Sequence, residues 1–461
     1  MRYRSLTLAV LAGVLGLTPA AGAAVLSADS AVVLALKNST QAIQADASVL
    51  DARAGYFSAS SGVLPSISAS GSRSVSTSDN GRSTGGSFVG TTEVPPTVVT
   101  DDERYSNNLG LSGRWNILNL SSIKGYSAAR TNLQAAELFR ISARQDIIFF
   151  TRRQFYEVVR AVRLSAVANG SLHLARDDER RVRALFEVGS VSKSDLLRAQ
   201  VRTSSAQLDS LIRRHAVTVQ RNLLARQLGI SEGTMGEVDT VLAVQIREFS
   251  EDSLLVEARN NRPDVKALEA ELRAAKASHT AAKFARLPYL TLAGSMGFDP
   301  RSHTKTTVVS GAVDSAGFPI TVPPNSFRSE ADRTMTGTIA IQWDLFDGRA
   351  TDARIASARS RLIQAQDAWD VLDRSLAQDV HEAWITYSEA LEAASLATRS
   401  VESATENLNL TQQKYNVGSA TILDLVDAQV QLLQAQSDQV SAQAGIRVAE
   451  AGVERIRGTG R

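Results

Sequence analysis

The chain has 461 residues, with 50 Lys and Arg against 48 Asp and Glu, and it contains no cysteine. This near-neutral balance gives no reason to expect a nucleic-acid partner or a polybasic membrane patch. The absence of cysteine excludes disulfides and a lipid-modified cysteine.

The first residues predict an export signal. Arg2 and Arg4 precede an apolar run from Leu6 to Leu17, and Ala21-Gly22-Ala23 fits the small-residue rule for signal cleavage. This run is shorter than the about 18 residues of a spanning helix, and a proline follows it. We predict a signal peptide over 1–23, with an uncleaved anchor helix as the alternative. Since no later stretch is apolar enough to span a bilayer, membrane entry requires strands closed into a barrel.

The rest of the sequence contains an internal duplication. Residues 188–199 align with 417–428 at a constant offset of 229, and six of these twelve positions are identical. Two Leu-Pro pairs and two strand-like segments ending near a tryptophan match in the same order. We therefore divide the chain into a first repeat, 24–250, and a second repeat, 251–461. Each is expected to contain a helix, a strand, a long loop, a strand, a very long helix, a tight turn and a long helix.

The first structural signal in each repeat is a helix that ends at Pro65 or Pro288, followed by an alternating strand. Apolar residues fall on one face of the predicted strands: Ile67, Ala69, Leu290, Leu292, Ile339, Ile341 and Trp343. Polar or small residues fall on the other: Ser66, Ser68, Thr291, Thr338, Ala340 and Gln342. This pattern is typical of membrane barrel strands, although a half-buried soluble sheet explains it equally well.

Two long segments rich in Gly, Ser, Thr and Pro separate the paired strands, at 77–104 and 299–333. Loops longer than about 15 residues are uncommon inside compact domains but ordinary on the outer rim of a membrane barrel. We therefore expect both segments to be external loops.

Two very long helices follow the strands, over 121–187 and 349–416. Neither contains proline, and each would extend about 100 Å at 1.5 Å per residue. The helices that return from the turns carry apolar residues at the 4-3-4-3 spacing of a coiled-coil seam. These seams are Leu197, Val201, Ser204, Leu208, Leu211 and Val426, Val430, Leu433, Ser437, Val440.

The export signal, the duplication, the strands after Leu-Pro and the Val-Gly turns together resemble the TolC-type outer-membrane efflux protein family. The turns Glu187-Val188-Gly189-Ser190 and Tyr415-Asn416-Val417-Gly418-Ser419 are the most specific part of this resemblance. The resemblance implies a mixed α+β membrane protein with a long α-helical coiled-coil barrel. It also implies a homotrimer in the outer membrane, with four strands per subunit in one 12-stranded transmembrane β-barrel.

The same resemblance implies a passive exit duct with a large periplasmic portion. A periplasmic adaptor would open its helical tip, and an inner-membrane pump of the RND or ABC type would supply energy and choose the cargo. Backbone hydrogen bonding in lipid independently favours a trimer. Four strands leave open edges whose backbone groups are unsatisfied in lipid, whereas twelve can close.

Candidate functional residues lie at the two turns. In the family such tips contact the adaptor, which implies docking roles for Val188, Gly189, Ser190, Val417, Gly418 and Ser419. Glycine at a helix end also serves the turn itself, and that structural reading has about equal weight.

The resemblance further implies a constriction at the second tip. Asp424 and Asp427 match aspartates that line the family's tunnel constriction, where threefold symmetry would gather six carboxylates. The alternative is that both acids favour a helix N-terminus. Tyr415, Asp195 and Ser194 match positions that hold the tip closed. The family often has an arginine where this chain has Ala420, which predicts a weaker closed state.

Trp115 and Trp343 are expected at the ends of strands, either as anchors at the membrane interface or as ordinary packing residues. The histidines at 173, 215, 279, 303 and 381 show no metal-ligand spacing, and no nucleotide-binding or hydrolase motif is present. We therefore expect no catalytic residue, no metal and no cofactor. The alternatives to a channel are a secreted or periplasmic coiled-coil scaffold without a pore and an exported hydrolase.

Overall fold

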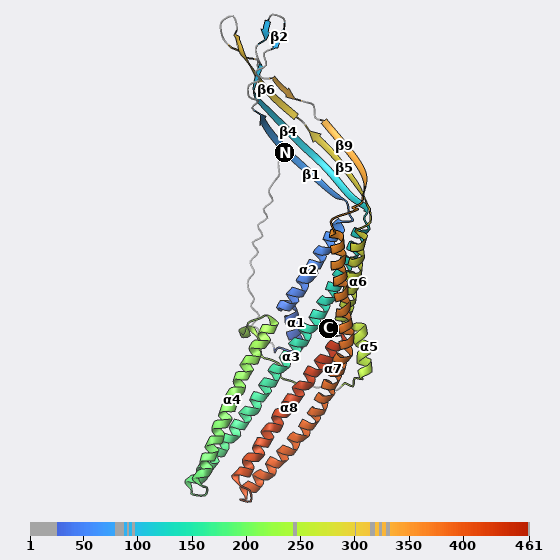
Figure 1. The fold of residues 1–461 in the computed structure, drawn as a ribbon. Helices are drawn as coiled ribbons and strands as arrows, with labels where there is room; N and C mark the ends of the chain where they lie inside the picture. The colour runs from blue at the N-terminus through green and yellow to red at the C-terminus, as the bar shows by residue number, and fades with distance from the viewer. Residues whose placement is uncertain are drawn as a thin grey trace, which may run out of the picture. The chain divides into compact units, whose positions relative to one another are not determined.

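The computed structural model describes residues 25–78, 87–89, 92–94, 97–242, 247–299, 301–313, 319–321, 325–328 and 332–459 (Figure 1). The predicted signal peptide lies outside these residues, as do parts of both predicted loops. The chain divides into two compact units. The helical unit comprises the segments up to Val49, Ala136–Ala267 and from Trp369 onward, and the sheet unit comprises Leu50–Ala135 and Leu268–Ala368.

The two very long helices form as predicted. α3 covers Leu120–Glu187 and α7 covers Ala350–Asn416, with 68 and 67 residues. Each is followed after a short turn by a helix of 36 residues, α4 at Lys193–Leu228 and α8 at Ile422–Arg457. The remaining helices are α1 Ala28–Asn38, α2 Thr40–Ser61, η1 Glu232–Thr234, α5 Glu251–Asn261 and α6 Pro263–Phe284.

Two apolar clusters form the core of the helical unit. In the first, Ile147, Phe155 and Val158 of α3 pack with Leu224 and Leu228 of α4, and small residues of α1 complete the cluster. In the second, α5, α7 and α8 bury a set of residues that includes Leu254, Leu376, Val380, Tyr387 and Val453. Because the buried side chains recur every three or four residues, each long helix buries one stripe and leaves the rest in solvent.

The seam predicted on α4 does not pack within the chain. Leu197, Val201 and Leu208 are 51%, 66% and 58% exposed, and α4 instead buries small residues such as Ala199 and Ser210 against the rest of the unit. Ser210 donates a hydrogen bond to the Asn169 side chain of α3 at 2.6 Å. Small residues permit a closer approach between α3 and α4 than leucines would. The predicted seam lies on another face of α4 and therefore stays exposed.

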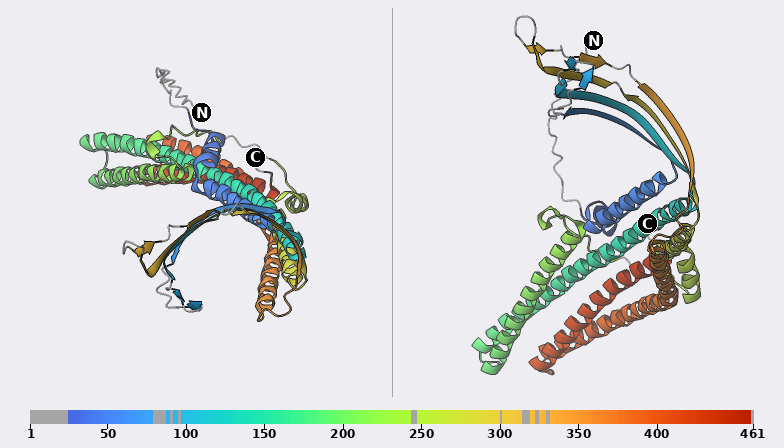
Figure 2. Two further views of the ribbon diagram at one scale, coloured as in Figure 1. Left: turned by 90° about the horizontal axis from the view of Figure 1, so that it is seen from above. Right: turned by 45° about the horizontal axis from the view of Figure 1, so that its top comes forward.

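The sheet unit contains four principal antiparallel strands in the order β1-β4-β5-β9. They cover Ser66–Ser78, Thr97–Leu118, Tyr289–Asp299 and Asp332–Gln342. In the described part of the chain β1 pairs only with β4 and β9 only with β5, so each leaves one edge unpaired. The sheet is strongly curved when seen along its strands (Figure 2).

The predicted external loops are shorter than expected, because strands extend into them. β4 begins at Thr97, and its first part pairs with β6, Arg301–Val313. The short strands are β2 Ser87–Val89, β3 Thr92–Val94, β7 Pro319–Thr321 and β8 Asn325–Arg328. The sequences of β6 and the start of β4 are rich in threonine and valine, which favour extended backbone. Gly, Ser and Pro nearby obscured this signal.

The strand registers confirm the predicted alternation of faces. One row across the sheet joins Ala69, Leu111, Met296 and Met335, and the next joins Ser68, Ser112, Ser295 and Thr336. Within the second row, hydroxyls pair at 2.8 Å between Ser68 and Ser112 and at 2.6 Å between Ser295 and Thr336. The sheet therefore has one apolar face and one hydroxyl-rich face.

Candidate gate, docking tips and membrane face

Both helical tips are built by the same backbone turn. At the first tip, the Gly189 amide donates to the Phe186 carbonyl at 2.9 Å, and the Ser190 amide donates to the Leu185 carbonyl at 2.8 Å. At the second, Gly418 and Ser419 make the equivalent bonds to Tyr415 and Lys414 at 3.0 and 2.9 Å. This pair of bonds is the Schellman motif, which satisfies the last carbonyls of a helix.

The glycines are required by backbone conformation. Gly189 and Gly418 have φ of 74° and 76°, in the left-handed region that other residues avoid. No atom lies within 4 Å of a Cβ added at either position, so conformation alone selects glycine. The valines before them, Val188 and Val417, are 74% and 79% exposed. Each tip therefore presents one apolar side chain on a fixed turn.

The helices that leave the tips begin with matching capping boxes. The Ser192 hydroxyl accepts from the Asp195 amide at 3.2 Å, while the Asp195 carboxylate accepts from the Ser192 amide and hydroxyl at 3.2 and 2.7 Å. Thr421 and Asp424 make the same bonds at 3.2, 2.8 and 2.7 Å. The side-chain hydrogen bond is the largest cause that holds the pKa of each aspartate below its usual range.

These caps give Asp195 and Asp424 one shared structural role, at positions 229 apart. Asp424 is exposed, as is Asp427, whose carboxylate accepts from Gln431 at 2.8 Å. Ser194 lies in the first turn of α4, beside the Asp195 cap. Capping accounts for Asp424 without a constriction, and the constriction role of both acids stays a prediction.

Tyr415 lies close to charged groups of the first hairpin, formed by α3 and α4. Burial raises the pKa of its hydroxyl, and the charges that act on it belong to Arg181, Asp178 and Asp195. Among the residues that the structure describes, this hydroxyl has no hydrogen-bond partner. Within one chain, Tyr415 and Asp195 thus lie near one another but form no hydrogen bond.

A buried polar contact between the two hairpins was missed by the sequence analysis. Asp178 of α3 and Gln429 of α8 are 9% and 7% exposed, and the Gln429 amide donates to the Asp178 carboxylate at 2.6 Å. Arg202 of α4 donates to the Val426 carbonyl at 3.4 Å. In sequence Asp178 belongs to a charged run that looks like a solvated face, so nothing distinguished it.

The two tryptophans occupy equivalent positions in the sheet unit. The Trp115 indole donates to the Val63 carbonyl at 3.0 Å, and the Trp343 indole donates to the Arg286 carbonyl at 2.9 Å. Each acceptor lies two residues before a proline that precedes a strand. Trp343 follows β9 rather than belonging to it, which corrects its predicted place on the strand. Each tryptophan thus holds the end of a strand to the segment before the neighbouring proline. A location at the membrane interface stays a prediction for both.

The apolar face of the sheet is exposed over much of its length, while Leu290 and Leu292 of β5 are half-buried. Ile67, Ile339, Ile341 and Met335 are between 71% and 84% exposed. Leu109, Leu111, Trp115 and Met296 continue the same face. Soluble proteins rarely leave so large a contiguous apolar surface uncovered.

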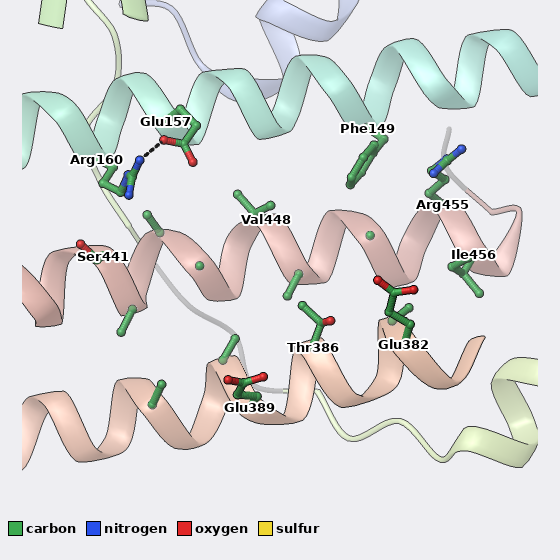
Figure 3. A pocket seen from close by; sticks show the side chains of 18 of the residues that line it. Phe149, Glu157, Arg160, Glu382, Thr386, Glu389, Ser441, Val448, Arg455 and Ile456 are labelled. Carbon is green, nitrogen blue, oxygen red and sulfur yellow. Dashed lines mark hydrogen bonds and ion pairs between the residues drawn. The ribbon is translucent and has the colours of Figure 1, made fainter. Parts of the chain in front are cut away.

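A groove in the helical unit runs between α3, α7 and α8 (Figure 3). Small residues such as Ala390, Gly445 and Ala449 line it together with charged residues. Several of these charges are paired, as in the contacts of Arg160 with Glu157 at 2.5 Å and of Arg455 with Asp146 at 2.7 Å.

Within the described ranges, no group of three or more His, Asp or Glu side chains could hold a metal ion. None of the helices described there is long and apolar enough to cross a membrane.

Comparison with known proteins identifies the family. The model of the family described as "Outer membrane efflux protein" matches residues 31–230 and again 254–459, which together are most of the chain. The chain belongs to the outer membrane efflux protein family. It is therefore an outer-membrane channel protein of the efflux and secretion class, with a large periplasmic portion, and not a scaffold without a pore.

Individual relatives are distant. Nodulation protein T of Rhizobium leguminosarum bv. trifolii is 24% identical over 342 residues, which are 70% of this chain and 67% of that protein. Outer membrane protein TolC of Escherichia coli (strain K12) is 20% identical over 323 residues, which are 68% and 62% of the two chains. The chain thus matches about two thirds of the length of these relatives.

The fold itself matches more completely. The crystal structure of the outer membrane protein VceC from Vibrio cholerae superposes with a TM-score of 0.73 at 17% identity, over 94% of this chain and 96% of that one. This agreement confirms the predicted combination of long helices and four principal strands.

Proposed function

We propose that this family member is the passive exit duct of a tripartite efflux or type I secretion system. Three copies join their sheets into one twelve-stranded barrel in the outer membrane, and their helices form the periplasmic tunnel. The duct performs no chemistry, so energy and cargo choice come from an inner-membrane pump of the RND or ABC type.

The exposed apolar face of the sheet carries this proposal. Lipid covers Ile67, Ile339 and Ile341, while the hydroxyl-rich face lines water. The free edges of β1 and β9 support assembly, because an unpaired strand edge in hydrocarbon leaves backbone groups without partners at several kcal/mol each. Pairing β9 of one copy with β1 of the next removes every such edge.

In this proposal a periplasmic adaptor docks on the tips and opens them. Val188, Gly189 and Ser190 form one docking tip, and Val417, Gly418 and Ser419 form the other. The exposed valines on rigid turns support this role. The repeats 24–250 and 251–461 would each supply one tip, in keeping with their matching turns and caps.

Asp424 and Asp427 would line the constriction, and Tyr415, Asp195 and Ser194 would hold it closed. Ala420 removes a charged latch. The buried contact of Asp178 with Gln429, which ties the two hairpins of one chain together, supports a closed state held by hydrogen bonds rather than by an arginine latch. We expect this state to be weaker than one held by an arginine.

Electrophoresis and planar-bilayer recording of the purified protein test this function. We expect a trimer band that dissociates only on boiling, and discrete conductance steps with frequent spontaneous openings. A monomer that stays soluble without detergent would refute the duct. A channel as tightly shut as relatives with the arginine would refute only the weak latch.

A further inference from the structure

One arginine stands alone on the hydroxyl-rich face at the end of the sheet where β4 leads into α3. Arg114 of β4 is exposed and lies in the row that joins Ser66, Arg114, Ala293 and Thr338. Its main-chain carbonyl accepts a bond from Ser66 at 3.2 Å. Among the residues whose side chains the structure describes, no carboxylate lies within ion-pair distance of its guanidinium. The positive charge is therefore available to a ligand.

The surroundings of Arg114 form a polar hollow. The hollow is lined by Arg114, glycines, an alanine and the hydroxyl residues Ser66, Ser68, Ser112, Ser295, Thr336 and Thr338. Hydroxyls reorient easily, because each is both a donor and an acceptor. A guanidinium beside several hydroxyls matches the needs of an oxyanion, which accepts two parallel bonds from arginine and single bonds from hydroxyls.

Charge on this face is sparse elsewhere. The strand registers place the other charged residues of this face, Asp102, Arg104, Asp332 and Asp299, at least six residues along their strands from the row of Arg114. Asp299 lies six residues beyond Ala293 on β5, which is about 20 Å along the strand. At that separation its attraction for Arg114 is screened by salt. Arg73 of β1 lies on the opposite, apolar face, with its guanidinium 5.8 Å from the Tyr105 ring. The two arginines thus provide a matched pair on opposite faces of one sheet.

We propose that Arg114 and the neighbouring hydroxyls bind the carboxylate or phosphate groups of solutes that pass through the duct. This inference rests on the proposed function, in which the hydroxyl-rich face lines the pore. Threefold assembly places three such sites in the barrel, at the end of β4 that leads into α3. They attract anions there, opposite in sign to the carboxylates of Asp424 and Asp427 at the second tip. A ring of fixed charge in a pore sets the preference between cations and anions.

Bilayer recording in zwitterionic phosphatidylcholine, which carries no net charge, tests the site and excludes a charged membrane surface as the source of the anion effect. A potassium chloride gradient gives the permeability ratio of cation to anion, and citrate serves as the oxyanion probe. We expect Arg114→Gln to raise the cation-to-anion ratio roughly two- to eightfold, from Coulomb attraction over about 10 Å in water. The same variant should abolish block by citrate. Arg73→Gln should change neither quantity.

Arg114→Lys separates charge from geometry. We expect it to keep the wild-type permeability ratio but to weaken citrate block, because lysine lacks the paired donors of arginine. If Arg114→Gln does not assemble, weaker citrate block in Arg114→Lys at an unchanged permeability ratio still supports the site. Unchanged ratio and block in Arg114→Gln, or equal changes in Arg73→Gln, would overturn the inference while leaving the duct intact. Failure of the wild-type protein to conduct would remove both.

Discussion

Gly189 and Gly418 show how single residues shape the two helical tips of this protein. Their positive φ closes each Schellman turn, and the valine before each is held out in solvent. The sequence alone identified these turns, because Val-Gly-Ser occurs twice at one offset. It did not show that Asp195 and Asp424 are equivalent caps, since capping depends on side-chain geometry at the first turn of each helix.

We expect Gly418→Ala to destabilise the second tip by about 1–2 kcal/mol, because alanine is strained at positive φ. Gly170→Ala is the matched control, since Gly170 lies inside α3, has open space around its Cβ position and has no positive φ. That change should stabilise α3 by about 0.5–1 kcal/mol. Hydrogen exchange of amides beside each site measures both effects. Equal protection changes of one sign in the two variants would contradict the conformational argument.

At the scale of elements, the contact between the two hairpins matters most. α3 and α7 could be predicted over nearly their whole length, because proline is absent from them and glycine is rare. The contact between Asp178 and Gln429 could not, because burial of Asp178 depends on where α8 lies. The exposure of the α4 seam could not be predicted either. The spacing of apolar residues indicates a helix that packs against another helix, but it does not say whether that second helix belongs to the same chain.

We expect Asp178→Leu to favour the open state, because it leaves the buried Gln429 amide without its acceptor, at about 1–3 kcal/mol. A loss of about 1.4 kcal/mol multiplies the ratio of open to closed channels by ten. Bilayer recordings measure that ratio. Adding Gln429→Leu should restore part of the loss, since both polar groups are then gone.

Asp209→Leu is the control for this experiment. It removes a half-exposed carboxylate of α4 that pairs with Arg213 at 3.3 Å, and ion pairs at the surface contribute little. We expect its open-to-closed ratio to stay within about twofold of the wild type. Equal opening in Asp178→Leu and Asp209→Leu would show that the buried contact does not restrain the tips.

For the whole molecule, the two faces of the sheet decide between a membrane duct and a soluble scaffold. The alternation of Ile339 and Ile341 with Thr338 and Ala340 was visible in the sequence, but its meaning was open. The exposure of Ile67, Ile339 and Ile341 on the apolar face favours the membrane interpretation of this pattern, and membership of the family agrees. The extent of β4 and β6 was less predictable, because Gly, Ser and Pro interrupt the threonine- and valine-rich stretches.

Accessibility of adjacent strand positions to lipid and to water is the most direct test. The chain has no cysteine, so Ile339→Cys and Thr338→Cys can each carry a single nitroxide label. In proteoliposomes we expect the label at 339 to relax with lipid-soluble oxygen, and the label at 338 to relax with a water-soluble nickel complex. Equal relaxation of both labels by the nickel complex would show that β9 does not face lipid, and the duct would be refuted.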